Sequence, residues 1–246
     1  ALLGRIPFDR TETPVQPRLA PGEDPRDALD PIDLGAALAA AQRAGGTWTK
    51  RFDEGGALAR FPLLAALVWY VALALLGGLA FPLVGALLPN LADRGWSVAR
   101  IAGLLVVAWL GWLISSLRWA PHVPLLLLGC VAALAALSAL AAWATRFDAL
   151  GWVRANLRRV AWLELVMLGL YVTFLAIKAS NPDLWHSNFG GEKPMDLAYL
   201  QAVLRSTYFP PYDPWFAGGR MNYYYFGFVV FGSLMELTRI VPWVAY

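Results

Sequence analysis

The sequence predicts an all-α integral membrane protein, and three observations support this fold class. Of its 246 residues, 59% are hydrophobic and only 15% are charged, which is more apolar surface than a soluble domain of this size can bury. The mean hydropathy is +0.52. Several apolar stretches approach the ~20 residues that a helix needs to cross a hydrocarbon layer of about 30 Å. Because backbone polar groups in lipid must be satisfied within the segment, we expect these stretches to be helices.

Five membrane spans are predicted, followed by the start of a sixth. The spans lie at about 61–88, 101–119, 123–144, 160–178 and 223–238. In the first span, Gly77, Gly78 and Pro82 are expected either to kink the helix or to let a neighbouring helix approach closely. Pro242 suits the first turn of a sixth helix. The chain ends in "VPWVAY", within an apolar stretch, so we expect it to be an internal fragment of a longer protein.

Residues 1–60 differ in composition from the transmembrane region 61–246. They mix Pro, Gly, Asp and Arg, as in "PVQPRLAPGEDPRDALDP". Such a segment buries too little apolar surface to fold alone, so we expect it to be mostly irregular and to lie extended on a neighbouring surface. The formal net charge is only +3, which gives no indication of nucleic-acid binding.

The distribution of arginines predicts the orientation in the cell membrane. The loop 145–159 contains four arginines and one acidic residue, so it is expected to be cytoplasmic. Alternation of the five spans then places Arg94, Arg100 and Arg239 on the same side. It places the N-terminal segment and the long loop 179–222 outside.

The outside loop contains a predicted amphipathic helix, "KPMDLAYLQAVLRS". Pro194 suits its first turn, and Asp196 complements the positive end of the helix dipole. Leu197, Leu200 and Leu204 repeat at i, i+3 and i+7 and form one apolar stripe. A short helix of this kind between two spans is expected to lie flat on the membrane surface.

Three stretches resemble the YYY-domain family of very hydrophobic integral membrane proteins. They are "LADRGWSVARIAGLLVVAWLGWLISSL", "GGEKPMD" and "RSTYFPPYDPWFAGGRMNYYYFG". The resemblance covers about residues 89–246 and excludes residues 1–60. That family is similar in fold to GT-C glycosyltransferases, which take a sugar from a polyprenyl-phosphate carrier on the outer membrane face. The resemblance therefore implies a GT-C-like glycosyltransferase whose partners are membrane lipids and a polyprenyl-phosphate sugar donor.

Asp196 and Glu192 are the predicted catalytic residues. One carboxylate would act as a general base on an acceptor hydroxyl, or Asp196 would hold a divalent cation against the lipid phosphate. The structural alternative is that Asp196 only stabilises a helix start, while Glu192 pairs with Lys193 or Arg220. Lys193 and Arg220 are the predicted phosphate-binding residues, since both can form charge-assisted bonds to phosphate. Their alternative role is to anchor the loop to anionic headgroups.

Five further residues are predicted to line an outside-facing pocket. They are Tyr223, Tyr224, Tyr225, Trp215 and Asp213. On a helix, the three consecutive tyrosines would fan across about 200° of the surface, so at least one hydroxyl would face the pocket beneath Asp196. The alternative for the tyrosines and Trp215 is an aromatic belt at the membrane interface. The alternative for Asp213, which precedes a proline, is a turn.

Two other functions remain open from the sequence. The chain is alternatively a structural or accessory transmembrane subunit of a larger membrane complex. A transporter fits less well, because we see no clear row of polar residues and no paired charges at mid-depth in a span. Glu164 and Glu236, which lie within predicted spans, are expected to have structural roles. A GT-C enzyme needs more spans than are present, so we expect this chain alone to be inactive.

Overall fold

The computed structural model describes residue 40 and residues 52–180, 193–215 and 219–246. Within these ranges every regular element is an α-helix, and the extended backbone is limited to one isolated antiparallel bridge between Tyr212 and Arg220. The all-α prediction is therefore confirmed for the described part of the chain. Most of the segment 1–60, predicted to be irregular, lies outside the described residues.

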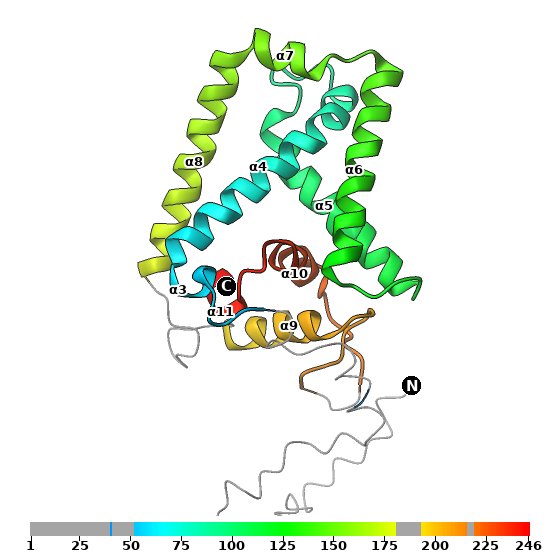
Figure 1. Cartoon of the computed structure of the whole chain (residues 1–246), viewed down its shortest axis with the longest axis vertical. Helices are drawn as coiled ribbons and strands as arrows, with labels where there is room; N and C mark the ends of the chain where they lie inside the picture. Colours follow the sequence, from blue (N-terminus) through cyan, green and yellow to red (C-terminus); the bar gives the residue numbers. More distant parts are fainter. Residues whose placement is uncertain (1–39, 41–51, 181–192, 216–218) are drawn as a thin grey trace, which may run out of the picture.

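Four long helices form the body of the molecule (Figure 1). They are α4 (Pro62–Leu87), α5 (Trp96–Ser116), α6 (Pro124–Thr145) and α8 (Leu157–Ser180). All four are long and apolar enough to cross a membrane. They correspond to the first four predicted spans, although α5 begins five residues before the predicted start at Ile101. They alternate in direction, so the turns that join them lie at opposite ends of the body.

Asp93 fixes the turn between α4 and α5. Its carboxylate accepts hydrogen bonds from the backbone N–H groups of Gly95 and Ser97, both at 3.0 Å, and from the Ser97 hydroxyl at 2.6 Å. Gly95 adopts a left-handed φ of 76°, which glycine tolerates without strain. Burial raises the pKa of Asp93, but the hydrogen bonds from Ser97 and Gly95 outweigh burial and hold it below its usual value. Asp93 is therefore ionised at neutral pH and caps the start of α5.

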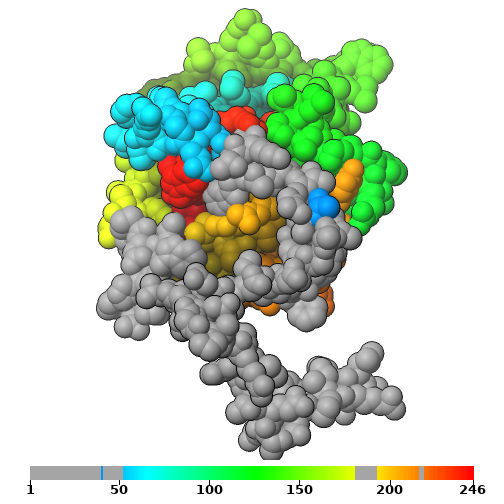
Figure 2. Space-filling view, turned by 60° about the horizontal axis from the view of Figure 1, so that its bottom comes forward, coloured from blue at the N-terminus to red at the C-terminus, as the bar shows by residue number. Residues whose placement is uncertain are grey.

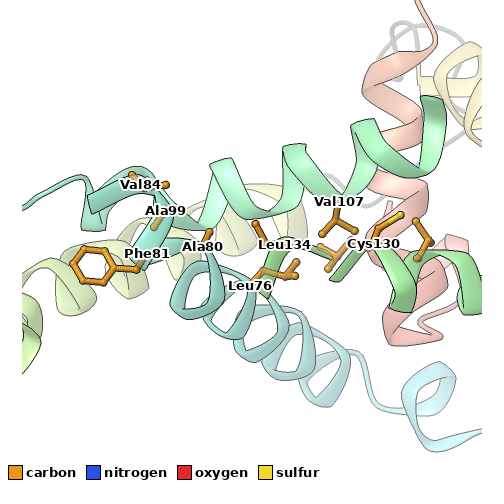
Figure 3. Close-up of a cluster of buried hydrophobic side chains, with 10 residues drawn as sticks. Leu76, Ala80, Phe81, Val84, Ala99, Val107, Cys130 and Leu134 are labelled. Atoms are coloured by element: carbon orange, nitrogen blue, oxygen red, sulfur yellow. The ribbon is translucent and has the colours of Figure 1, made fainter. Parts of the chain in front are cut away.

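The main apolar core lies between α4, α5 and α6 (Figure 3). Its buried members include Leu76 and Phe81 from α4, Val107 from α5 and Leu134 from α6. Glycines permit this close approach. A Cβ atom on Gly103 would lie 2.6 Å from the backbone oxygen of Leu76. Gly77 approaches Arg100 in the same way, whereas a Cβ on Gly78 would meet nothing within 4 Å. Of the two alternatives for Gly77, the close approach of a neighbouring helix is the one observed.

α8 is attached to the other long helices by polar and aromatic side chains. Glu164 forms an ion pair with Arg100 of α5 and accepts a hydrogen bond of 2.8 Å from Trp96 Nε1. Further along α8, the Tyr171 hydroxyl donates to the Ala66 carbonyl oxygen at 2.8 Å. Arg100 and Glu164 thus pair near the α7 end of the long helices, so this pair does not contradict the expectation of no paired charges at mid-depth. Glu164 does have the structural role that was predicted for it.

Short helices lie at the two ends of the body. α7 (Ala149–Ala155) joins α6 to α8 at one end. The opposite end carries a group of four helices, which we call the cap (Figure 1). The cap consists of α3 (Ala57–Arg60), α9 (Lys193–Arg205), α10 (Phe226–Thr238) and α11 (Pro242–Ala245).

The prediction of a fifth span at 223–238 is not confirmed. α10 has only 13 residues, about 20 Å of helix, which is too short for a hydrocarbon layer of about 30 Å. It lies across the end of the long helices (Figure 1). Ser233 Oγ lies 3.3 Å from Nε2 of His122, in the turn between α5 and α6. Arg239 Cζ lies 5.8 Å from the ring of Phe52, which precedes α3. Arg239 is therefore at the cap end, and its predicted position beside the loop 145–159 is wrong.

α11 starts at Pro242, as expected for a helix whose first turn contains proline. Glu236 on α10 is 1% exposed, and its Oε2 lies 3.9 Å from Arg239 Nη1 at i+3. Its predicted local pairing with Arg239 is thus observed, although it is at the cap end of the body.

We predict that Gly103→Ala destabilises the protein by about 1–3 kcal/mol, because the added methyl would collide with the backbone of α4. Gly78→Ala is the matched control. Its Cβ meets nothing within 4 Å, and alanine favours a helix over glycine by about 0.5–1 kcal/mol. Thermal unfolding of both variants in detergent measures the difference. Equal Tm values would contradict a close α4–α5 crossing at Gly103.

Candidate functional site

The predicted loop helix is present as α9, and its apolar stripe faces the protein. Leu197, Leu200 and Leu204 are 5%, 1% and 4% exposed. Leu200 and Leu204 pack in one apolar cluster with Met235 of α10. α10 and its neighbours thus cover the stripe, and the expectation that α9 lies flat on the membrane surface stays a prediction. This packing fixes the polar first turn of α9, which carries Asp196, against the cap.

Asp196 lines a pocket of about 300 Å³ in the cap. The walls come from α4, α9, α10 and the C-terminal residues, and include Trp69, Leu200 and Phe228. The Tyr246 hydroxyl donates a hydrogen bond of 3.4 Å to Asp196 Oδ2. Burial and the neighbouring Asp196 carboxylate raise the pKa of Tyr246 to about 12. The phenol therefore stays protonated at neutral pH and remains a donor to the carboxylate.

A second, larger cavity adjoins the Asp196 pocket. It has a volume of about 370 Å³ and lies between α4, α8 and α11. The two cavities share Trp69, Ala245 and Tyr246 as lining residues. Figure 2 shows this end of the molecule, with the C-terminal segment (red) between the start of α4 (cyan) and α8 (yellow) and beside α9 (gold). The Asp196 pocket thus lies beside the space between two long helices.

Arg220, Asp213 and Trp215 occupy a separate hairpin-like loop. The Asp213 N–H donates to the Gly219 carbonyl oxygen at 3.1 Å, and Asp213 Oδ1 accepts from the Trp215 N–H at 2.8 Å. The latter contact forms the turn that was the alternative for Asp213. Arg220 donates to the Pro210 carbonyl oxygen at 3.1 Å, and its Cζ lies 3.8 Å from the centre of the Tyr212 ring. Neither Arg220, Asp213 nor Trp215 lines the Asp196 pocket.

The three tyrosines precede α10 and do not lie on it, so the helical fan predicted for them is wrong. Tyr225 is the N-cap residue, and its hydroxyl accepts a hydrogen bond of 3.2 Å from Trp112 Nε1. Tyr223 and Tyr224 stack with ring centres 3.9 Å apart, and Tyr224 is 78% exposed.

Together the tyrosines line an open groove of about 350 Å³ with Trp109, Trp112 and Phe226. This groove has no lining residue in common with the Asp196 pocket. The nearest link between them is Tyr199 of α9, whose ring centre is 5.4 Å from that of Tyr223 and 6.0 Å from that of Phe228. The structure therefore separates the tyrosines from Asp196 by one layer of aromatic side chains.

Glu192, the second predicted carboxylate, lies outside the described residues, so its distance from Asp196 is not defined. Lys193 is described and begins α9, three residues before Asp196. Within the described ranges, no three His, Cys, Asp or Glu side chains gather as a metal site. Asp196 is the carboxylate that this part of the chain offers to a cation in the pocket.

Three residues near the site escaped the sequence analysis. His122 is 3% exposed and joins the turn before α6 to the cap, since its N–H donates to the Thr207 carbonyl oxygen at 2.6 Å. Lys178 and Tyr246 meet across the larger cavity, with Lys178 Nζ 4.7 Å from the ring centre. The sequence could have indicated Lys178, because it is a cation at the end of an apolar run. It could not have indicated Tyr246, because the neighbours of Tyr246 are distant in sequence.

The fold and the site define a helical membrane protein with a mostly apolar pocket, which is lined by one carboxylate, in a cap at one end. A family model described as "Uncharacterized membrane protein (DUF2298)" matches residues 106–246, which is more than half of the chain. The chain belongs to this family. The matched region contains α6, α8 and all of the cap except α3. No match was found among curated proteins or among solved structures.

We predict that Tyr225→Phe lowers stability by about 0.5–1.5 kcal/mol, because it removes the acceptor of the part-buried Trp112 N–H. Tyr224→Phe is the control, since an exposed side chain of this kind changes stability by no more than about 0.5 kcal/mol. Thermal unfolding of the full-length protein in detergent compares them. A larger loss of stability in Tyr224→Phe than in Tyr225→Phe would show that the Trp112–Tyr225 hydrogen bond does not hold the three tyrosines in place.

Proposed function

We propose that the chain is part of a GT-C-like membrane glycosyltransferase that uses a polyprenyl-phosphate-linked sugar at the cap end, on the outer membrane face. The supporting observation is that the Asp196 pocket adjoins the apolar cavity between α4 and α8 and shares lining residues with it. A lipid-linked substrate needs an apolar path from the bilayer and a pocket with a polar group, here Asp196, for its head. The resemblance to the YYY-domain family supports the same reaction class.

Asp196 is the proposed general base. Its carboxylate would accept the proton of an acceptor hydroxyl as that oxygen attacks the anomeric carbon, while the bond to the lipid phosphate breaks. The hydrogen bond from Tyr246 orients the carboxylate and leaves its other oxygen to meet the acceptor. The same carboxylate would alternatively hold a divalent cation against the phosphate. Glu192 remains a proposed partner in either role.

The leaving phosphate requires positive charge, because negative charge develops on it as the sugar departs. Lys193 is a proposed phosphate ligand, since it begins the helix that carries Asp196. Arg220 is proposed as a second ligand, although its contacts with Pro210 and Tyr212 hold it on the hairpin-like loop. Trp215, which is 62% exposed, and the groove formed by the three tyrosines are proposed to bind sugar by stacking.

An accessory transmembrane subunit is the second proposed function, and the exposure of α8 favours it. Only 6% of its most apolar window is buried. Phe174 and Ile177 are 68% and 60% exposed. Such a helix offers a large apolar face to lipid or to another membrane subunit.

The test is Asp196→Asn in the full-length protein, with sugar transfer from a polyprenyl-phosphate donor as the readout. Loss of a general base is expected to reduce transfer by about 10²–10⁴-fold. Asp213→Asn is the matched control, because Asp213 forms a turn outside the pocket and its variant should keep nearly full activity. Unchanged transfer by Asp196→Asn at normal expression would remove Asp196 from the mechanism.

A further inference from the structure

The larger cavity has the form of a binding site for a chain-like molecule. We call it the α4–α8 cleft. Ala66 and Trp69 of α4 form one wall, Leu175 of α8 another, and Trp243 and Val244 of α11 close the third side. Its volume of about 370 Å³ falls within the range of about 300–1,000 Å³ that is usual for small-molecule sites. Its lining is mostly apolar, so it favours an apolar occupant.

Positive charge is concentrated at one end of the α4–α8 cleft. Lys178 is the charged residue in its lining, and its ammonium group lies over the ring of Tyr246 at 4.7 Å. An anion beside the Lys178 ammonium group would be attracted to it, and the charge of Lys193, which begins α9, would add to this attraction. The head of the occupant is therefore expected to be anionic.

The surroundings of the α4–α8 cleft give access from the hydrocarbon of the bilayer. Leu63, at the start of α4, lines the cleft and is 85% exposed. On α8, Phe174 and Ile177, which do not line the cleft, are also exposed. An apolar chain can thus pass between α4 and α8 without crossing water. A free anion would gain nothing from the apolar walls.

We propose that the α4–α8 cleft binds a lipid phosphate, with the chain between α4 and α8 and the phosphate at Lys178 and Lys193. The inference deepens the proposed function, because it assigns the phosphate of the donor lipid to Lys178. Arg220 does not line the α4–α8 cleft, because its contacts with Tyr212 and Pro210 hold it on the hairpin-like loop. The sugar of such a lipid would enter the adjoining Asp196 pocket past Tyr246.

A simpler role for Lys178 makes a different prediction. A lysine near the end of a membrane helix often extends its ammonium group toward water and serves only as an anchor. In that case its charge would contribute nothing to the affinity for a particular lipid, and filling the α4–α8 cleft would have no effect on lipid binding.

The experiment measures lipid binding to the full-length protein in detergent by native mass spectrometry. Three probes are compared: geranylgeranyl monophosphate, geranylgeraniol, which has the same chain without phosphate, and inorganic phosphate. Lys178→Gln removes the charge and Lys178→Arg restores it. Ala66→Phe fills the α4–α8 cleft. The matched controls are Arg158→Gln, an exposed charge at the opposite end, and Leu67→Phe, at an exposed α4 position that does not line the cleft.

We expect Lys178→Gln to weaken binding of the lipid phosphate by about tenfold, the loss of one charge-assisted hydrogen bond. Lys178→Arg should keep the affinity for the lipid phosphate. Geranylgeraniol should bind equally to the parent protein and to both Lys178 variants. Ala66→Phe should weaken the binding of both lipids, and both control variants should bind them as the parent protein does. Inorganic phosphate should neither bind at these concentrations nor compete.

The inference is overturned if Lys178→Gln and Ala66→Phe bind the lipid phosphate as the parent protein does while their Tm values are unchanged. It is also overturned if inorganic phosphate displaces the lipid completely, since the site would then recognise a free anion. A different outcome would contradict the proposed glycosyl transfer without affecting the lipid site. If Asp196→Asn retains transfer while Lys178→Gln loses lipid binding, the lipid site stands and the catalytic role of Asp196 does not.

Discussion

The position of the candidate site depends on α10 packing across the end of the long helices. The helix is too short to span the hydrocarbon layer, and one of its faces is instead buried by protein, whereas Phe231 is exposed. Val229 and Met235 are fully buried, and Met235 packs with Leu200 and Leu204 of α9. α9 therefore has a fixed face toward the bundle. This packing holds Asp196 beside Tyr246 and the start of α4.

The long helices make two kinds of contact with one another. Where α4, α5 and α6 meet, small residues and apolar side chains allow close packing, with Gly103 against the backbone at Leu76. α8 is different, because it is held mainly through Glu164 and Tyr171, which contact α4 and α5 by polar groups. A loosely attached α8 leaves the α4–α8 cleft between the two helices near the cap. The Tyr171–Ala66 hydrogen bond lies in the lining of the cleft, whereas the Glu164 contacts lie nearer to α7. Polar attachment of this kind is compatible with an opening to lipid, whereas a continuous apolar interface would close it.

The long helices could be predicted because their signals are local. Apolar runs of sufficient length indicated α4, α5, α6 and α8, and Pro194 with the leucine repeat indicated α9. The prediction of a fifth span was not confirmed. The apolar residues before Thr238 indicate a buried segment, and hydropathy does not distinguish burial in protein from burial in lipid. The helical arrangement predicted for the three tyrosines was wrong for a related reason. The assumed helix begins only after Tyr225, so their directions are set by contacts with Trp112 and Tyr199.

The candidate site could be predicted only in part. Asp196 and Lys193 were found because they lie in the first turn of a recognisable helix. Lys178, Tyr246 and His122 acquire their meaning from contacts with residues far away in the chain, and neither spacing nor composition records such contacts. Arg220 and Asp213 are near Tyr225 in sequence, yet the turn at Asp213 and the stacking of Arg220 on Tyr212 place them on a separate loop.

The central claim is that α9, α10 and α11 all lie on one membrane face. Single cysteines test it most directly, introduced as Arg205→Cys, Arg239→Cys and Arg154→Cys in a full-length protein that lacks other reactive cysteines. Each position is exposed, and each is labelled from either side of the membrane with an impermeant maleimide. Positions 205 and 239 should be labelled from one side and position 154 from the other. Labelling of position 239 from the same side as position 154 would show that the segment 223–238 crosses the membrane and would contradict this account.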